Sequence, residues 1–444
     1  MNKIVLVISF WLIAQYAFGQ EQISSLKTIS LEEAIAIALE SNHDIIITKN
    51  ETVINSNNAT PGNAGLLPTI TASGAYSGSI QDSEIRFNGG VAPDQNNTGA
   101  RSNTLTGSLS ANYTLFDGFG NYYRFQSLKK LEELAGVQER LLIESTMLQV
   151  IQNYLNVVLA SKNLEINKEA IQRSEERFQR VSKRFELGNA SRIDVLSAEV
   201  DLNSDKVALI QSERDLEKLK RDLLIQLGSE PDTEIEIKDE VTINSIITLD
   251  QILSDSQVYN ASLILTKLSS ENAELNYTQT QSGRFPVVNL NGSYDYSKSE
   301  LGAGQLSYQQ VNGLSGGISV SLNIFNGFQL KTRVENAQIQ LKNSQESLSL
   351  AQKSLKRDIL NTYEDYQTNL LLIEKEAINL ETASLNFERT KQLFELGQVT
   401  NTELREAQLN VSRIEQSLVL LNIQAKISEI SLYQLSGQLI NSDV

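Results

Sequence analysis

The chain has 444 residues, a formal net charge of −16, one histidine and no cysteine. The acidic balance argues against nucleic-acid binding, which needs clustered basic residues. The lack of cysteine excludes disulfides, thiolate metal sites and a lipid-modified N-terminal cysteine, and the single His43 cannot build a triad or metal cluster that needs several histidines.

Residues 1–19 are predicted to be a cleaved secretory signal peptide. Lys3 precedes an apolar run at 4–13 that is too short to span a bilayer, and Ala17 and Gly19 put small residues before the predicted cut. A buried N-terminal helix is the alternative, but the polar stretch 20–27 argues against it. No later apolar run approaches the roughly 20 residues of a transmembrane helix. The mature chain is therefore expected to be exported, either soluble or crossing an outer membrane as β-strands.

The rest of the chain is an internal duplication. The motif from Phe116 to Phe119 recurs from Phe325 to Phe328, and the motif from Phe185 to Gly188 recurs at the same spacing from Phe394 to Gly397. These matches predict a first repeat at 20–228, an acidic equatorial linker at 229–247, a second repeat at 248–437 and a C-terminal tail at 438–444.

Each repeat is predicted to consist of a helix, two strands, a long helix and a return helix. The first repeat has these elements at 31–58, about 68–83, 104–116, 120–185 and 191–227. The second begins with a helix from 248 and continues at about 287–297, 314–325, 327–394 and 400–436. Polar loops at 81–103 and 297–313 are expected to join the strands of each pair.

The predicted strands alternate apolar with small polar residues. In 70–80, for example, Ile70, Gly74 and Tyr76 alternate with threonine and serine. Segments of about ten residues with one apolar and one polar face are typical of outer-membrane β-barrel strands. A half-buried soluble sheet is the alternative, but it would need packing helices nearby. Four strands leave two unpaired edges, which lipid does not tolerate, so an oligomer of at least two chains is expected.

The predicted long helices contain no proline, and 120–185 would extend over about 99 Å at roughly 1.5 Å per residue. From Leu355 to Phe387, apolar and small residues recur every three or four positions, which indicates helices packed at shallow angles. Gly188 and Gly397 are predicted to form the helix-tip turns, and Ser191 and Thr400 to cap the return helices.

This duplicated order of elements and motifs resembles the TolC family of outer-membrane efflux proteins over nearly the whole mature chain. The resemblance implies a mixed α and β membrane protein whose subunits each supply four barrel strands and long antiparallel helices. Three subunits would assemble a twelve-stranded β-barrel in outer-membrane lipid, continued by a periplasmic α-helical barrel. The implied function is a passive exit duct of a tripartite efflux or type I secretion system, with a periplasmic adaptor (membrane fusion protein) and an inner-membrane pump at the helical tips.

The resemblance also implies that the tips close inward as an iris. The aperture gate then falls on Asp194, Glu403, Glu406 and Phe394. Because Glu403 and Glu406 lie three apart on one helix face, a trimer can hold them as carboxylate rings that bind cations. The alternative is that these acids only solvate the hairpin. The family often has an arginine and a hydroxyl-bearing aromatic at this tip, and here Val399 and Phe394 stand in their places.

Aromatic residues gather where the predicted strands become helices. We predict that they form a membrane-interface belt, with ordinary packing of a strand end as the alternative. The belt residues are Phe116, Phe119, Tyr122, Tyr123, Phe325 and Phe328.

Two other classes of protein fit parts of the sequence. A secreted or periplasmic structural helical rod, or an adhesin, would explain the acidic helices but not the two pairs of alternating strands. An enzyme is disfavoured because acids such as Glu175 and Glu176 have no histidine or cysteine partner to activate a nucleophile. We therefore predict no catalytic residue and no cofactor.

Overall fold

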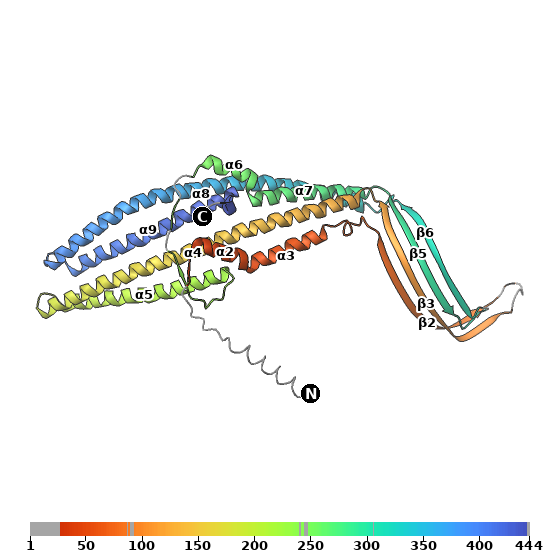
Figure 1. The fold of residues 1–444 in the computed structure, drawn as a ribbon, viewed down its shortest axis with the longest axis horizontal. Coiled ribbons are helices and arrows are strands. Elements are labelled where there is room, and N and C mark those ends of the chain that lie inside the picture. The colour runs from red at the N-terminus through yellow and green to blue at the C-terminus, as the bar shows by residue number, and fades with distance from the viewer. Residues whose placement is uncertain are drawn as a thin grey trace, which may run out of the picture. The chain divides into compact units, whose positions relative to one another are not determined.

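The computed structural model describes residues 27–86, 88, 93–238, 241–243, 247–304 and 306–441, and the predicted signal peptide lies outside them. Figure 1 shows the elements, which follow in chain order as β1 Lys27–Ile29, α2 Leu31–Ser41, α3 His43–Asn58, β2 Thr69–Ile85, β3 Gln95–Phe116, α4 Gly120–Glu186, α5 Arg192–Gln226, β4 Ile235–Ile237, α6 Leu249–Tyr259, α7 Ala261–Ser282, β5 Val287–Glu300, β6 Tyr308–Ser321, α8 Gln329–Glu395, α9 Asn401–Ser436 and the 3-10 helix η2 Leu439–Asn441. They fall into two compact units. One comprises the described residues up to 45, residues 143–252 and those from 359 onward, and the other comprises 46–142 and 253–358.

The second unit contains a four-stranded antiparallel sheet in the order β2-β3-β5-β6. Its register sets apolar residues opposite one another, as in Tyr76 with Leu105 and Tyr294 with Leu314. Successive side chains of a strand point to opposite faces, so these pairs lie on one apolar face of the sheet. In the single chain this face is uncovered, since Tyr76 is 71 % and Leu314 84 % exposed.

The strands differ in length from the prediction. β2 continues to Ile85 and β3 begins at Gln95, so the predicted loop 81–103 is mostly strand. The polar sequence at 95–103 lacks apolar alternation, which is why periodicity alone missed it. β6 occupies Tyr308–Ser321 rather than 314–325. It ends early because β5 starts directly after Pro286, leaving residues beyond 321 without a paired strand.

The first unit is built around α4 and a short parallel strand pair. β1 pairs with β4, which comes from the predicted linker 229–247. The Tyr154 hydroxyl lies within hydrogen-bond distance of two carbonyl oxygens, those of Ile29 at 3.0 Å and Lys238 at 2.9 Å. These hydrogen bonds join the N-terminal segment and the linker to α4. Tyr154 belongs to a hydrophobic core that also includes Ile151, Leu223 and Ile430.

The opening helix of each repeat is interrupted, which corrects the single helix predicted at 31–58. α2 ends at Ser41 and α3 starts at His43, while α6 and α7 are separated by Asn260. The side-chain oxygen of Asn42 accepts hydrogen bonds from the Asp44 and Ile45 amides, at 2.9 and 3.2 Å. Asn260 caps α7 in the same way through the Leu263 amide. Each asparagine therefore caps the second helix and ends the first.

Candidate functional site at the helical hairpin tips

Two helical hairpins, α4–α5 and α8–α9, end in matching turns (Figure 1). Gly188 and Gly397 both have a φ of 74°, a left-handed conformation that glycine adopts without a steric penalty. The amide of Asn189 donates to the Arg184 carbonyl at 2.7 Å, and Gln398 donates to Leu393 at 2.9 Å. This is the Schellman arrangement that closes a helix C-terminus.

The predicted gate acids Asp194 and Glu403 each belong to a capping box. Asp194 Oδ2 accepts from the backbone amide and the hydroxyl of Ser191 at 2.9 and 2.6 Å. Glu403 Oε2 accepts from the same groups of Thr400 at 2.6 and 2.8 Å. The Ser191 hydroxyl and amide lower the pKa of Asp194, and the Thr400 amide and hydroxyl lower the pKa of Glu403. Both acids are therefore held as carboxylates that stabilise the starts of α5 and α9.

Glu406 lies one turn further along α9 than Glu403, and its side chain is exposed. Both side chains are exposed, and the Glu403 carboxylate in addition accepts from the Thr400 amide and hydroxyl of its own hairpin. Within the described part of one subunit, no three acidic or histidine side chains are grouped to hold a metal ion. A cation ring at this level needs carboxylates from several subunits.

Phe394, which the resemblance assigns to the aperture gate, is buried. It is 4 % exposed and packs in a core between the two hairpins together with Val181 and Phe387. The Arg184 guanidinium lies 5.2 Å from the centre of its ring and donates to its carbonyl oxygen at 3.2 Å. Phe394 therefore joins α8 to α4 within one subunit.

A polar cluster links the return helices below this core. Arg405 on α9 donates to both carboxylate oxygens of Asp205 on α5, at 2.7 and 2.8 Å, and to the Ser174 hydroxyl on α4 at 3.1 Å. Ser174 in turn donates to Asp205. Arg177 on α4 is 1 % exposed and pairs with Asp201 at 2.8 Å. Three helices from the two hairpins thus meet at one charged cluster.

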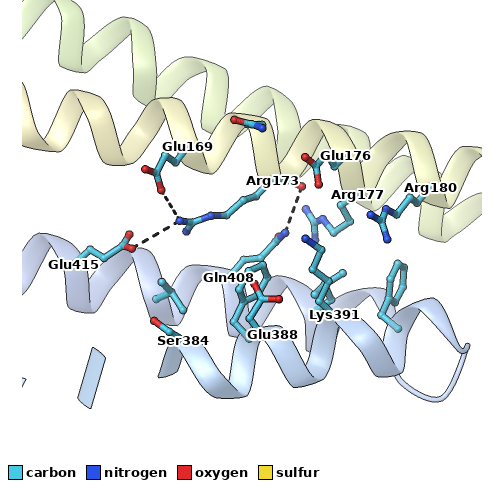
Figure 2. Close-up of a pocket in the computed structure, with 15 residues that line it drawn as sticks. Glu169, Arg173, Glu176, Arg177, Arg180, Ser384, Glu388, Lys391, Gln408 and Glu415 are labelled. Carbon is cyan, nitrogen blue, oxygen red and sulfur yellow. Dashed lines mark hydrogen bonds and ion pairs between the residues drawn. The ribbon is translucent and has the colours of Figure 1, made fainter. Parts of the chain in front are cut away.

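A cavity of about 420 Å³ opens beside this cluster (Figure 2). Arg173 reaches across it from α4 and lies 2.6 Å from Glu169 and 3.7 Å from Glu415 on α9. Gln408 donates to the Arg173 carbonyl at 3.4 Å. Burial raises the pKa of Glu415, and the charge of Arg173 lowers it by less. The cavity between the hairpins therefore contains a partly buried carboxyl group whose pKa is raised.

The predicted belt residues occupy two strand-to-helix corners with the same geometry. Phe116 and Phe119 stack edge-to-face at 5.6 Å, and Phe325 and Phe328 at 5.4 Å. Phe119 and Phe328 have φ values of 67° and 64°, which bulky residues rarely adopt. Phe325 is 71 % and Phe328 65 % exposed. The exposed rings of Phe119, Phe325 and Phe328 fit a membrane interface, and the belt stays a prediction.

The charged ties between the hairpins were not predicted from the sequence. Arg405 and Asp205 are 200 residues apart, and each sits among many other charged residues on a long helix. Arg180 on α4 also pairs with Glu395 on α8, close to the tips.

The chain matches the family model described as "Outer membrane efflux protein" over residues 34–228 and 252–438. It is 21 % identical to the outer membrane protein TolC of Escherichia coli over 362 residues, 78 % of this chain and 72 % of that protein.

Solved structures give the same picture of the fold. A membrane protein from Pseudomonas aeruginosa superposes with a TM-score of 0.79 at 16 % identity, covering 93 % of this chain and 91 % of that one. The outer membrane protein VceC of Vibrio cholerae gives 0.75 at 16 % identity, covering 92 % and 96 %. Of the helices described for this chain, none combines the length and apolarity that crossing a membrane requires.

Proposed function

This chain belongs to the outer membrane efflux protein family, and on that premise we propose that three copies of it build one exit duct. The family places the chain in the outer membrane, with a periplasmic helical part, as the exit channel of a tripartite efflux system. It is a family of channels and not of enzymes.

The observation that carries the proposal is the four-stranded sheet. One face is apolar and uncovered, and the outer strands β2 and β6 have no further partner among the described strands. Lipid accepts the apolar face but not the open edges, so copies must close the sheet on itself. Eight strands leave almost no bore, and twelve from three chains is the smallest multiple of four with a useful channel.

We assign the gate to the hairpin tips. Asp194, Glu403 and Glu406 lie at the start of the return helices, where a trimer gathers carboxylates around its axis. Like charges repel, so the closed form needs ties between helices. Arg405 with Asp205, and Arg180 with Glu395, supply such ties within each subunit.

The tips are also where partners dock in this proposal. A periplasmic adaptor and an inner-membrane pump would engage the helical ends, and cargo would pass through the duct without chemical change. Separation of the two hairpins, whose contacts include Phe394 and Arg184, would open the passage.

Two measurements test the assembly. The purified mature protein should conduct ions in planar bilayers and should have a mass in mild detergent of roughly three times 47 kDa. A monodisperse monomer would contradict the trimer. Absence of conductance, even in variants with loosened tips, would contradict the duct.

A further inference from the structure

Within the regularly paired part of the described strands, the polar face of the sheet carries a single ionisable side chain. In the regular part of the register, at 69–81, 100–114, 289–299 and 309–321, the polar-face positions hold serine, threonine, asparagine, glutamine and small or apolar residues, with the sole exception of Asp295. The carboxylate of Asp295 therefore dominates the electrostatic potential at this part of the face, because the neighbouring polar-face residues carry no charge.

The carboxylate of Asp295 is oriented by its neighbours. The Ser108 hydroxyl, across the strand pair on β3, donates to Oδ1 at 2.6 Å. The Ser293 hydroxyl, two residues earlier on β5, donates to Oδ2 at 2.5 Å. Charge-assisted hydrogen bonds of this kind favour the ionised form and fix its position.

The carboxylate is also left open on its other side. Asp295 pairs with Gly313 on β6, and a Cβ placed on Gly313 would meet no atom within 4 Å. The side chain itself is exposed. An ion that moves along this face can therefore approach Asp295 directly.

We propose that Asp295 is a charge-selecting residue of the duct and biases passage through the strand section toward cations and against anions. The proposal rests on the trimeric duct described above, in which the polar face lines the bore and three Asp295 carboxylates form one ring. Rings of acidic side chains select cations in channels. The cargo class that this ring favours is cationic or uncharged.

Glu300 offers a matched control on the same strand. It lies on the opposite face, at an odd number of positions from Asp295, and pairs with Lys298 at 3.0 Å. Glu300→Gln and Asp295→Asn each remove one negative charge per chain from β5. Asp295→Asn removes the charge from the polar face, and Glu300→Gln removes it from the apolar face.

The test is the reversal potential of the purified protein in planar bilayers under a KCl gradient. In Asp295→Asn we expect the permeability ratio of K⁺ to Cl⁻ to fall roughly twofold near 0.1 M salt, and further near 0.01 M, where the Debye length grows from about 10 to about 30 Å. Asp295→Glu should keep the ratio of the parent protein. Glu300→Gln should keep it as well.

Each result separates the inference from the proposed function. A parent protein without conductance would contradict the duct. A conducting Asp295→Asn protein with an unchanged ratio, or an equal change in Glu300→Gln, would overturn the role of Asp295 and leave the duct intact. If Asp295→Asn does not assemble, Asp295→Ser, which matches the surrounding hydroxyls, takes its place in the same comparison.

Discussion

The guanidinium of Arg405 donates two hydrogen bonds to the carboxylate of Asp205, from Nη2 to Oδ1 at 2.7 Å and from Nη1 to Oδ2 at 2.8 Å. Their side chains are only 13 % and 12 % exposed, so water screens the pair weakly. The pair joins α9 to α5 and therefore the second hairpin to the first. Any motion that separates the hairpins must break it.

Asp205→Asn should loosen the hairpins. The substitution leaves Arg405 without its counter-charge in a largely buried place, which costs roughly 2–3 kcal/mol of unfolding free energy. We expect a lower thermal midpoint and a higher mean conductance in planar bilayers. The control is Asp215→Asn, which removes an exposed partner of Arg214 on the same helix and should change neither.

Removing both partners should restore the stability that the single change loses. In Arg405→Met with Asp205→Leu, no buried charge remains and apolar contact replaces the pair. Thermal unfolding of the two single variants and the double variant gives the coupling between the positions. A double variant that is as unstable as both single losses combined would show that the two side chains act independently.

Glu406 should contribute more than Glu403 to block by polyvalent cations. The Glu403 carboxylate is shared with the Thr400 cap, whereas Glu406 is free to meet ions at the axis. Glu406→Gln should weaken block and cation preference clearly, and Glu403→Gln should weaken them less, since the Thr400 amide and hydroxyl already occupy the Glu403 carboxylate. Single-channel current with and without added polyvalent cations measures both. Unchanged block in the doubly substituted protein would place the gate elsewhere.

Stability should depend on pH through Glu415. Its pKa is raised in the folded chain, chiefly by burial, so the folded form binds this proton more readily than the unfolded form. The free energy of unfolding therefore falls as pH rises from about 4.3 through the folded pKa. Glu415→Gln should remove this component of the fall, and thermal midpoints measured from acid to neutral pH would show a flatter profile. Asp215→Asn, which removes an exposed partner of Arg214 on α5, should keep the parent profile.

The belt can be located with tryptophan. The only tryptophan, Trp11, lies in the predicted signal peptide, so an introduced tryptophan would be the sole source of tryptophan fluorescence in the mature chain. Phe325→Trp should be quenched by lipids brominated near the headgroup, because the ring of Phe325 is exposed and predicted to lie at the interface. Leu385→Trp, at a position 67 % exposed on α8, should not be quenched. Equal quenching of the two would contradict the belt.

The sequence predicts the helices better than the contacts between them. The α8 bounds, Gln329–Glu395, lie within two residues of the predicted 327–394, since Gly397 and Thr400 mark the turn locally. The ends of the strands were missed because their polar residues do not alternate with apolar ones. The breaks at Asn42 and Asn260 were missed because a single capping side chain does not change the hydrophobic periodicity of the sequence. The ion pair of Arg405 with Asp205 depends on the packing of α9 against α5. A local sequence pattern does not predict which residues of two distant helices come into contact.

The duplication makes the joints between hairpins unequal. By the spacing that relates the repeats, the counterparts of Arg405 and Asp205 are Leu196 and Ile414. In the proposed trimer, six hairpins alternate around the axis. The contact between the two hairpins of one subunit contains the ion pair of Arg405 and Asp205. The equivalent contact between hairpins of neighbouring subunits would contain Leu196 and Ile414. A ring of six identical single repeats could not make this distinction. The three joints inside the subunits should therefore resist separation more than the three joints between subunits, and the ring should not open evenly.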